Sequence, residues 1–158
     1  MTDSFATHLT RLRAYALRPA TRRDPKPGEI EAFEAELGRT LPEPYRSFLA
    51  RWGRHALSSV PRFDLDRAEP ARSGCISQFF GFSTDGSSDL VKATRETYAG
   101  RVPDDTVPIG RDPGSGLVLL GIAGPRRGQV FASGVSAPVA ETFGEFLQML
   151  RPDPLYDE

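Results

Sequence analysis

Two short helices joined by a tight turn are predicted for residues 30–53, and they constrain the fold more than any other part of the chain. Ile30, Phe33 and Leu37 recur at helical spacing, and Gly38 follows them where a helix commonly ends in a left-handed residue. A second stripe begins after a first turn that contains proline, where the missing N–H costs nothing. Its members are Tyr45, Phe48, Leu49 and Trp52. Both helices are expected to bury these faces.

The segments on either side of this pair are predicted from similar patterns. A helix is expected near the start of the chain, with an apolar stripe formed by Phe5, Leu9, Leu12 and Ala16. Three prolines and an aspartate predict an irregular linker over residues 19–27. Residues 54–73 show little periodicity and are predicted to be mainly a long loop, the kind of segment that often carries function. Within that loop, Val60, Phe63 and Leu65 would fit one short strand.

The second half of the chain is predicted to be mostly antiparallel β-structure. A strand is expected over 74–82 and a short helix over 89–98, followed by three strands over 106–109, 116–122 and 129–132. Short connections between those strands allow hairpins but not parallel crossovers. Thr142 and Glu145 predict a capping box that opens a last helix. We therefore divide the chain into a helix and linker (1–26), one domain (27–152) and a tail (153–158).

The order of these pieces resembles the SUKH superfamily, which includes the yeast Smi–Knr cell-wall assembly regulators and many bacterial relatives. The segment IEAFEAELGRTLPEPYRSFLARWG, residues 30–53, matches its opening signature, except that Trp52 stands where asparagine is commoner. Downstream, FFGF, VPIGRDPGSGLVLLGI, GQVFA and TFGEFLQML resemble its strands and its last helix. Gly121 stands where the family often has aspartate. The resemblance covers about residues 28–150 and implies a single α+β domain with a mixed, largely antiparallel sheet packed with helices.

Composition narrows the classes of partner. The chain has 158 residues, a formal net charge of −1 and one cysteine, and its pI is about 6.2. Nucleic-acid-binding domains usually have a pI above roughly 9, so we expect no nucleic-acid partner. One cysteine allows no intramolecular disulfide. No secretory signal or membrane-spanning run is evident, so we expect a cytoplasmic protein that does not bind membranes.

The residue types that carry chemistry do not form a recognisable site. His8 and His55 lie on different predicted elements, and a nucleophile formed by Cys75 with His55 would lack a third residue to orient it. The glycines of 110–116 lead into a strand rather than a helix and lack the P-loop lysine. The acidic residues of 85–89 lack the final glutamate of a calcium loop. We therefore expect no enzyme, no metal site and no cofactor.

The resemblance implies binding to another protein. Many bacterial members of the superfamily are immunity proteins that neutralise a toxin by binding it directly, and we expect this function here. The alternative is a non-toxin adaptor or regulatory scaffold, as in the yeast relatives, and an enzyme of unrecognised type is a third hypothesis. For partner contacts we expect Arg62, Phe63 and Asp64 in the long loop, because loops on a rigid scaffold often carry recognition. The basic pair Arg126 and Arg127 is also a candidate, since arginine is enriched at interfaces.

Overall fold

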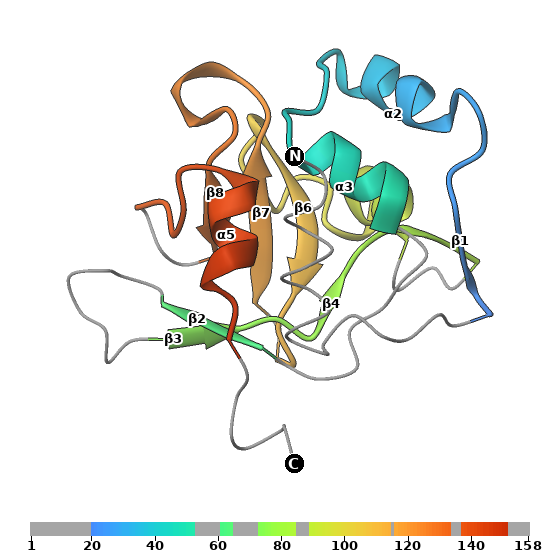
Figure 1. Cartoon of the computed structure of the whole chain (residues 1–158). Helices are drawn as coiled ribbons and strands as arrows, with labels where there is room; N and C mark the ends of the chain where they lie inside the picture. Colours follow the sequence, from blue (N-terminus) through green and yellow to red (C-terminus); the bar gives the residue numbers. More distant parts are fainter. Residues whose placement is uncertain are drawn as a thin grey trace.

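A computed structural model describes residues 20–52, 61–64, 73–84, 89–114, 116–133 and 137–151 (Figure 1). The predicted helix at the start of the chain and the predicted tail lie outside these ranges. Helices and antiparallel strands combine into a small α+β domain, which confirms the predicted fold class. Within the described ranges, no helix is both long enough and apolar enough to span a membrane.

The central sheet confirms the three strands predicted for the second half of the chain. Its four antiparallel strands lie in the order β4 (Gln78–Phe79), β6 (Thr106–Arg111), β7 (Leu117–Gly121) and β8 (Val130–Ala132). Their register pairs Val107 with Leu120, and Leu120 with Val130. A bulge falls between Pro108 and Gly110. A Cβ atom at Gly110 would lie 2.6 Å from the carbonyl oxygen of Gln78, so this close approach of β4 and β6 requires glycine.

Two separate two-stranded ladders accompany this sheet and change two predictions. Strand β2 (Arg62–Asp64) pairs with β3 (Ser73–Cys75), and β1 (Arg22–Arg23) pairs with β5 (Phe82–Ser83). The strand predicted over 74–82 is therefore three short strands, because the chain leaves the β2 ladder to join β6 and then β1. The predicted linker contains β1, which the buried side chain of Arg22 fixes by donating to the carbonyl of Phe79 at 2.6 Å.

The helices follow the predicted order. They are α2 (Glu29–Leu37), α3 (Tyr45–Trp52), α4 (Leu90–Lys92) continued by the π-helix η2 (Ala93–Thr97), and α5 (Phe143–Met149). Gly38 ends α2 with φ at 70°, in the left-handed conformation expected for it. Asp89 caps α4 by accepting from Lys92 N–H at 3.0 Å. The helix predicted over 89–98 is thus present, but most of it is wound as a π-helix.

Helices α3 and α5 lie beside the sheet (Figure 1). A cluster of aromatic side chains joins these helices to the sheet in the centre of the core. The ring of Phe143 on α5 lies 4.8 Å from that of Phe48 and 5.0 Å from that of Tyr45, both on α3. Phe79 on β4 contacts both helices, at 5.4 Å from Phe48 and 5.9 Å from Phe143. Buried rings contribute large apolar areas and gain from edge-to-face contact, so this cluster fixes α3 and α5 on one face of the sheet.

The capping box that opens α5 is present in modified form. Thr142 accepts a hydrogen bond from Glu145 N–H at 3.0 Å, as predicted. The Glu145 carboxylate accepts from the N–H of Glu141, one residue before the cap, at 3.0 Å. Both side chains therefore satisfy backbone donors that the helix start would leave unpaired.

Candidate functional site

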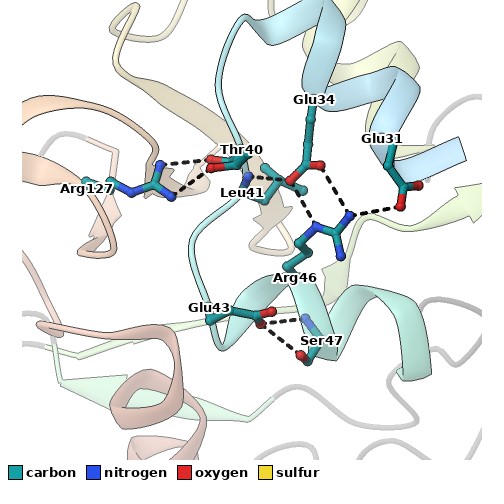
Figure 2. Close-up of polar contacts among 8 residues, drawn as sticks. All are labelled: Glu31, Glu34, Thr40, Leu41, Glu43, Arg46, Ser47 and Arg127. Atoms are coloured by element: carbon teal, nitrogen blue, oxygen red, sulfur yellow. Dashed lines mark hydrogen bonds and ion pairs between the residues drawn. The ribbon is translucent and has the colours of Figure 1, made fainter. Parts of the chain in front are cut away.

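A buried carboxylate joins the two helices of the signature segment. Glu34 is 8% exposed and lies on the inner side of α2. Its Oε2 accepts from the backbone N–H of Leu41 at 2.7 Å and from Arg46 Nε on α3 at 3.0 Å (Figure 2). Arg46 also reaches the exposed Glu31 at 3.2 Å. One guanidinium thus ties α3 to two carboxylates on α2.

The electrostatics of this contact favour the charged form of Glu34. Burial alone raises the pKa of Glu34, but the hydrogen bonds from Arg46 and from Leu41 N–H outweigh it, so the pKa is lowered overall. The same contact raises the pKa of Arg46. Glu34 and the half-buried Arg46 are therefore both ionised at neutral pH, and their charges are compensated within the domain.

Arg127 holds the same connection from the opposite side. Its guanidinium donates to the carbonyl oxygen of Thr40 at 2.8 Å and to the Thr40 hydroxyl at 3.1 Å (Figure 2). It also donates to the carbonyl of Ile122 at 2.8 Å. Arg127 therefore links the turn after β7 to the segment between α2 and α3, and these contacts use its donors inside the domain.

Beside α2, on the side of η2, lies an open groove. Two adjoining hollows of about 330 and 340 Å³ form it. Its lining combines an apolar floor with a charged rim: Glu29, Ala32, Phe33, Glu36, Leu37, Val91, Thr94 and Arg95. We call this surface the α2–η2 groove. Arg95 on η2 forms an ion pair with Glu36 on α2, so the charges of the rim are balanced across it.

The position of Glu29 at the groove is fixed by Arg23 of β1. The two terminal guanidinium nitrogens of Arg23 donate to the two Glu29 oxygens at 2.6 Å, and Lys26 N–H donates to the same carboxylate at 2.8 Å. The hydrogen bond from Arg23 is the main reason that the pKa of Glu29 is lowered. The predicted linker therefore helps to build the groove.

The structure places the predicted contact residues apart from this groove. Phe63 is 2% exposed, with its ring 5.0 Å from that of Phe146 on α5. The expectation of an exposed contact at Phe63 is wrong, because β2 turns this residue into the core. Arg62 begins β2, where it pairs with Cys75 and with Arg151, and Asp64 ends the strand.

Arg126 is an exposed predicted contact, with 44% of its side chain accessible. Its guanidinium carbon lies 5.1 Å from the centre of the Phe131 ring, and its Nε lies 3.6 Å from the Asp105 carboxylate. Arg126 and Arg127 are neighbours in sequence but make separate contacts. Partner binding by Arg62, Asp64, Arg126 or Arg127 stays a prediction.

The structure also shows the surroundings of some residues that were considered for a metal, nucleophile or phosphate site. Among the residues that the structure describes, no three His, Cys, Asp or Glu side chains lie close enough to hold a metal ion. His8, His55 and residues 85–88 fall outside those residues. Cys75 is half-buried in β3. In the glycine-containing turn, the Asp112 carboxylate accepts from the N–H groups of Gly114 at 2.8 Å and Gly116 at 3.0 Å, which fits a hairpin turn.

Comparison with known protein families identifies the family of this chain. Residues 24–149 match the SMI1/KNR4 family, SUKH-1. The chain belongs to this family. No curated protein matches the chain significantly. The family match confirms the resemblance predicted from the signature segment, whose helices are the ones that Glu34 and Arg46 join.

One departure of this SUKH-1 domain from the family pattern has a direct explanation. At Gly121, a Cβ atom would lie 2.0 Å from the carbonyl oxygen of Arg126. The turn after β7 therefore returns so close to the strand that it leaves no space for a side chain. The aspartate that relatives often carry would force this turn, and Arg127 with it, to move.

Sequence patterns missed both parts of the site for different reasons. Glu34 lies four residues after Ile30 and three before Leu37, on the buried face of α2. Helical spacing alone could have identified it as a buried carboxylate. No spacing pattern in the sequence indicates the groove. The groove depends on how α2 packs beside a helix that comes more than 50 residues later in the chain.

Proposed function

We propose that this SUKH-1 protein is an immunity protein that binds a toxin domain and blocks it, with the α2–η2 groove as the contact surface. Family membership supports binding to a protein partner. We choose the groove as the contact surface because it combines an accessible apolar floor with charges of both signs. Interfaces commonly combine an apolar centre with a polar rim.

The dimensions of the groove fit side chains of a protein. Pockets for small molecules usually have volumes of about 300–1,000 Å³ and enclose most of the ligand. Each hollow here is at the lower end of that range, and both are open to solvent. The matching partner inserts an apolar side chain between Ala32 and Val91. It also presents an acidic and a basic group that replace the exposed Glu36–Arg95 ion pair.

A π-helix on one wall is consistent with a functional surface. π-helical turns are rare in proteins and are frequently found at functional sites. Here η2 carries Arg95 and Thr94, which line the groove. Thr94 also donates to the carbonyl of Leu90 at 3.0 Å, which stabilises the turn that precedes it.

Growth rescue with a matched pair of variants tests the proposal. A photo-crosslinker at position 32 identifies the partner, whose domains are then expressed to find one that stops growth. Co-expression of the wild-type protein should restore growth, and Ala32→Arg should not, because it fills the groove. Ala35 is an exposed alanine on the same helix outside the groove, so Ala35→Arg should still restore growth.

Each of the other results has a defined meaning. If no crosslinked partner domain is toxic, or if the wild-type protein does not restore growth, the immunity function is wrong and the adaptor hypothesis replaces it. If Ala32→Arg and Ala35→Arg both restore growth, the protein is an immunity protein but the groove is not its contact surface.

A further inference from the structure

We propose that the α2–η2 groove receives one amphipathic helix of the partner, with two apolar side chains a turn apart and an acidic and a basic side chain between them. This partner chemistry rests on the proposed function of the groove and specifies what the toxin domain presents there. It follows from where the two hollows of the groove meet, from which charges of the rim are held in place, and from the helices that form the walls.

An ion pair divides the groove into its two hollows. Phe33, Glu36 and Arg95 line both of them. Glu36 lies on α2 and Arg95 on η2, so their ion pair joins the two walls where the hollows adjoin. One hollow extends from this contact to Ala32, and the other extends to Leu37. The two volumes are nearly equal, about 330 and 340 Å³, so each hollow can take one apolar side chain of similar size.

The ion pair across the groove is easier to displace than the other charges of the rim. The side chains of Glu36 and Arg95 are 48% and 55% exposed, and exposed ion pairs contribute little to stability because water screens them. Glu29, by contrast, is held by both terminal nitrogens of Arg23. A partner that covers the groove can therefore separate Glu36 from Arg95. It must then supply a base to one and an acid to the other, because a buried charge without a partner is costly.

The walls of the groove suit a helix. One wall is α2 and the other is η2, and a groove between two helices accepts a ridge of side chains from a third helix. Ala32 and Leu37 are five positions apart on α2, which corresponds to a rise of about 7.5 Å. Side chains at positions i and i+4 of a helix are separated by a rise of about 6 Å. One helix can thus place an apolar side chain in each hollow.

The same geometry fixes where the partner carries its charges. Successive residues of an α-helix are turned by about 100°, so positions i+1 and i+3 lie on opposite sides of the ridge formed by i and i+4. A basic side chain on one side meets Glu36 on α2, and an acidic side chain on the other meets Arg95 on η2. The expected segment therefore reads apolar, charged, any residue, opposite charge, apolar.

A library of helical peptides displayed on phage tests this pattern on the full-length protein. The peptides have about 16 residues in an alanine-rich sequence, which is long enough to form a helix, and two turns are randomised. Ala32 lines the groove and Ala35 is exposed outside it. Peptides that bind the wild type and Ala35→Arg, but not Ala32→Arg, therefore bind at the groove. We expect them to carry apolar residues at i and i+4 and opposite charges at i+1 and i+3.

An exchange of charges on both molecules measures the role of the ion pair. The double variant Glu36→Arg, Arg95→Glu keeps an ion pair between the walls but reverses its direction. A selected peptide should bind the wild type roughly tenfold more tightly than the double variant. The same peptide with its acid and base exchanged should show the opposite preference in isothermal titration calorimetry. If the double variant folds poorly, the sequences selected on the wild type decide the result.

Three results would overturn the proposal. They are the absence of groove-dependent peptides, groove-dependent peptides that lack the two apolar positions or the paired charges, and equal affinities of both peptides for both proteins. The growth rescue described above is independent of these measurements. The expected peptide pattern with a failed rescue would refute the immunity function and keep the helix-binding groove. A successful rescue without this pattern would refute the partner chemistry alone.

Discussion

The two helices of the signature segment are held in different ways. Helix α3 is attached through rings, because Tyr45 and Phe48 contact Phe143 of α5 within 5.0 Å. Helix α2 buries Ile30 and Phe33, but its contacts to α3 and to the segment before α3 include a buried carboxylate and a guanidinium. Adjacent helices of one hairpin thus rely on different kinds of interaction.

This difference determines what each helix can do. Apolar burial is non-directional and does not depend on pH, so the position of α3 relative to the sheet is insensitive to charge. Charge-assisted hydrogen bonds fix distance and angle, and they respond to protonation. The α2–η2 groove is built on α2, so its position is tied to the polar contacts of α2 as well as to the burial of Ile30 and Phe33.

The largest loss of stability is expected from a substitution in the aromatic core. Phe143→Ala removes a ring that contacts α3 and β4, and large-to-small changes of this type cost about 3–5 kcal/mol. The free energy of unfolding measured in urea checks this value, and Phe143→Leu should cost clearly less. A loss under about 1 kcal/mol for Phe143→Ala, the average for point mutants, would show that α3 does not depend on this cluster.

A smaller but still substantial loss of stability is expected when the buried Glu34 carboxylate is replaced. Glu34→Gln keeps the shape but removes the charge that Arg46 contacts, which should cost about 1.5–3 kcal/mol. Glu31 pairs with the same arginine on the same helix, but its side chain is 65% exposed. Glu31→Gln should therefore cost no more than about 0.5 kcal/mol. Equal losses in chemical denaturation would show that burial does not set the strength of this contact.

The same carboxylates predict a loss of stability in acid. The pKa values of Glu34 and Glu29 are lowered in the folded state, from an ordinary value of about 4.5. The folded state then binds fewer protons than the unfolded state, so stability is complete above that value and falls as the pH drops through the lowered pKa. Unfolding free energies measured between about pH 6 and pH 3 should show this fall. Glu34→Gln should reduce the slope, and an unchanged slope would contradict the assignment.

The sequence predicts most of the fold because its apolar periodicities are local. The stripe of Tyr45, Phe48 and Leu49 predicts α3, and the capping residue Thr142 predicts the start of α5 at Phe143. Predictions failed where partners distant in sequence decide the structure. Phe63 is buried because β2 pairs with β3 and packs on α5, and nothing in the sequence around residue 63 specifies those neighbours.

The candidate surfaces were harder to predict for the same physical reason. Arg62 was predicted as a contact in a loop, but it begins β2, and its backbone neighbours depend on the register of β2 and β3. The groove needs the pairing of β1 with β5 as well as the π-helix, since Arg23 holds Glu29 and Arg95 pairs with Glu36. Residue types therefore identify good candidates, whereas tertiary contacts decide which of them share a surface.

The smallest predicted losses of stability are those of two neighbouring arginines, Arg126 and Arg127, which should differ from each other. Arg127→Ala loses the hydrogen bonds to Thr40 and Ile122 and should cost about 1 kcal/mol, discounted for their exposure. Arg126→Ala loses a ring contact and a weak ion pair, so it should cost about 0.5 kcal/mol. Amide hydrogen exchange adds a sharper measurement, because Arg127→Ala should speed exchange at Leu41 N–H, whereas Arg126→Ala should not. Unchanged exchange at Leu41 in both variants would mean that Glu34 and Arg46 alone position the segment between α2 and α3.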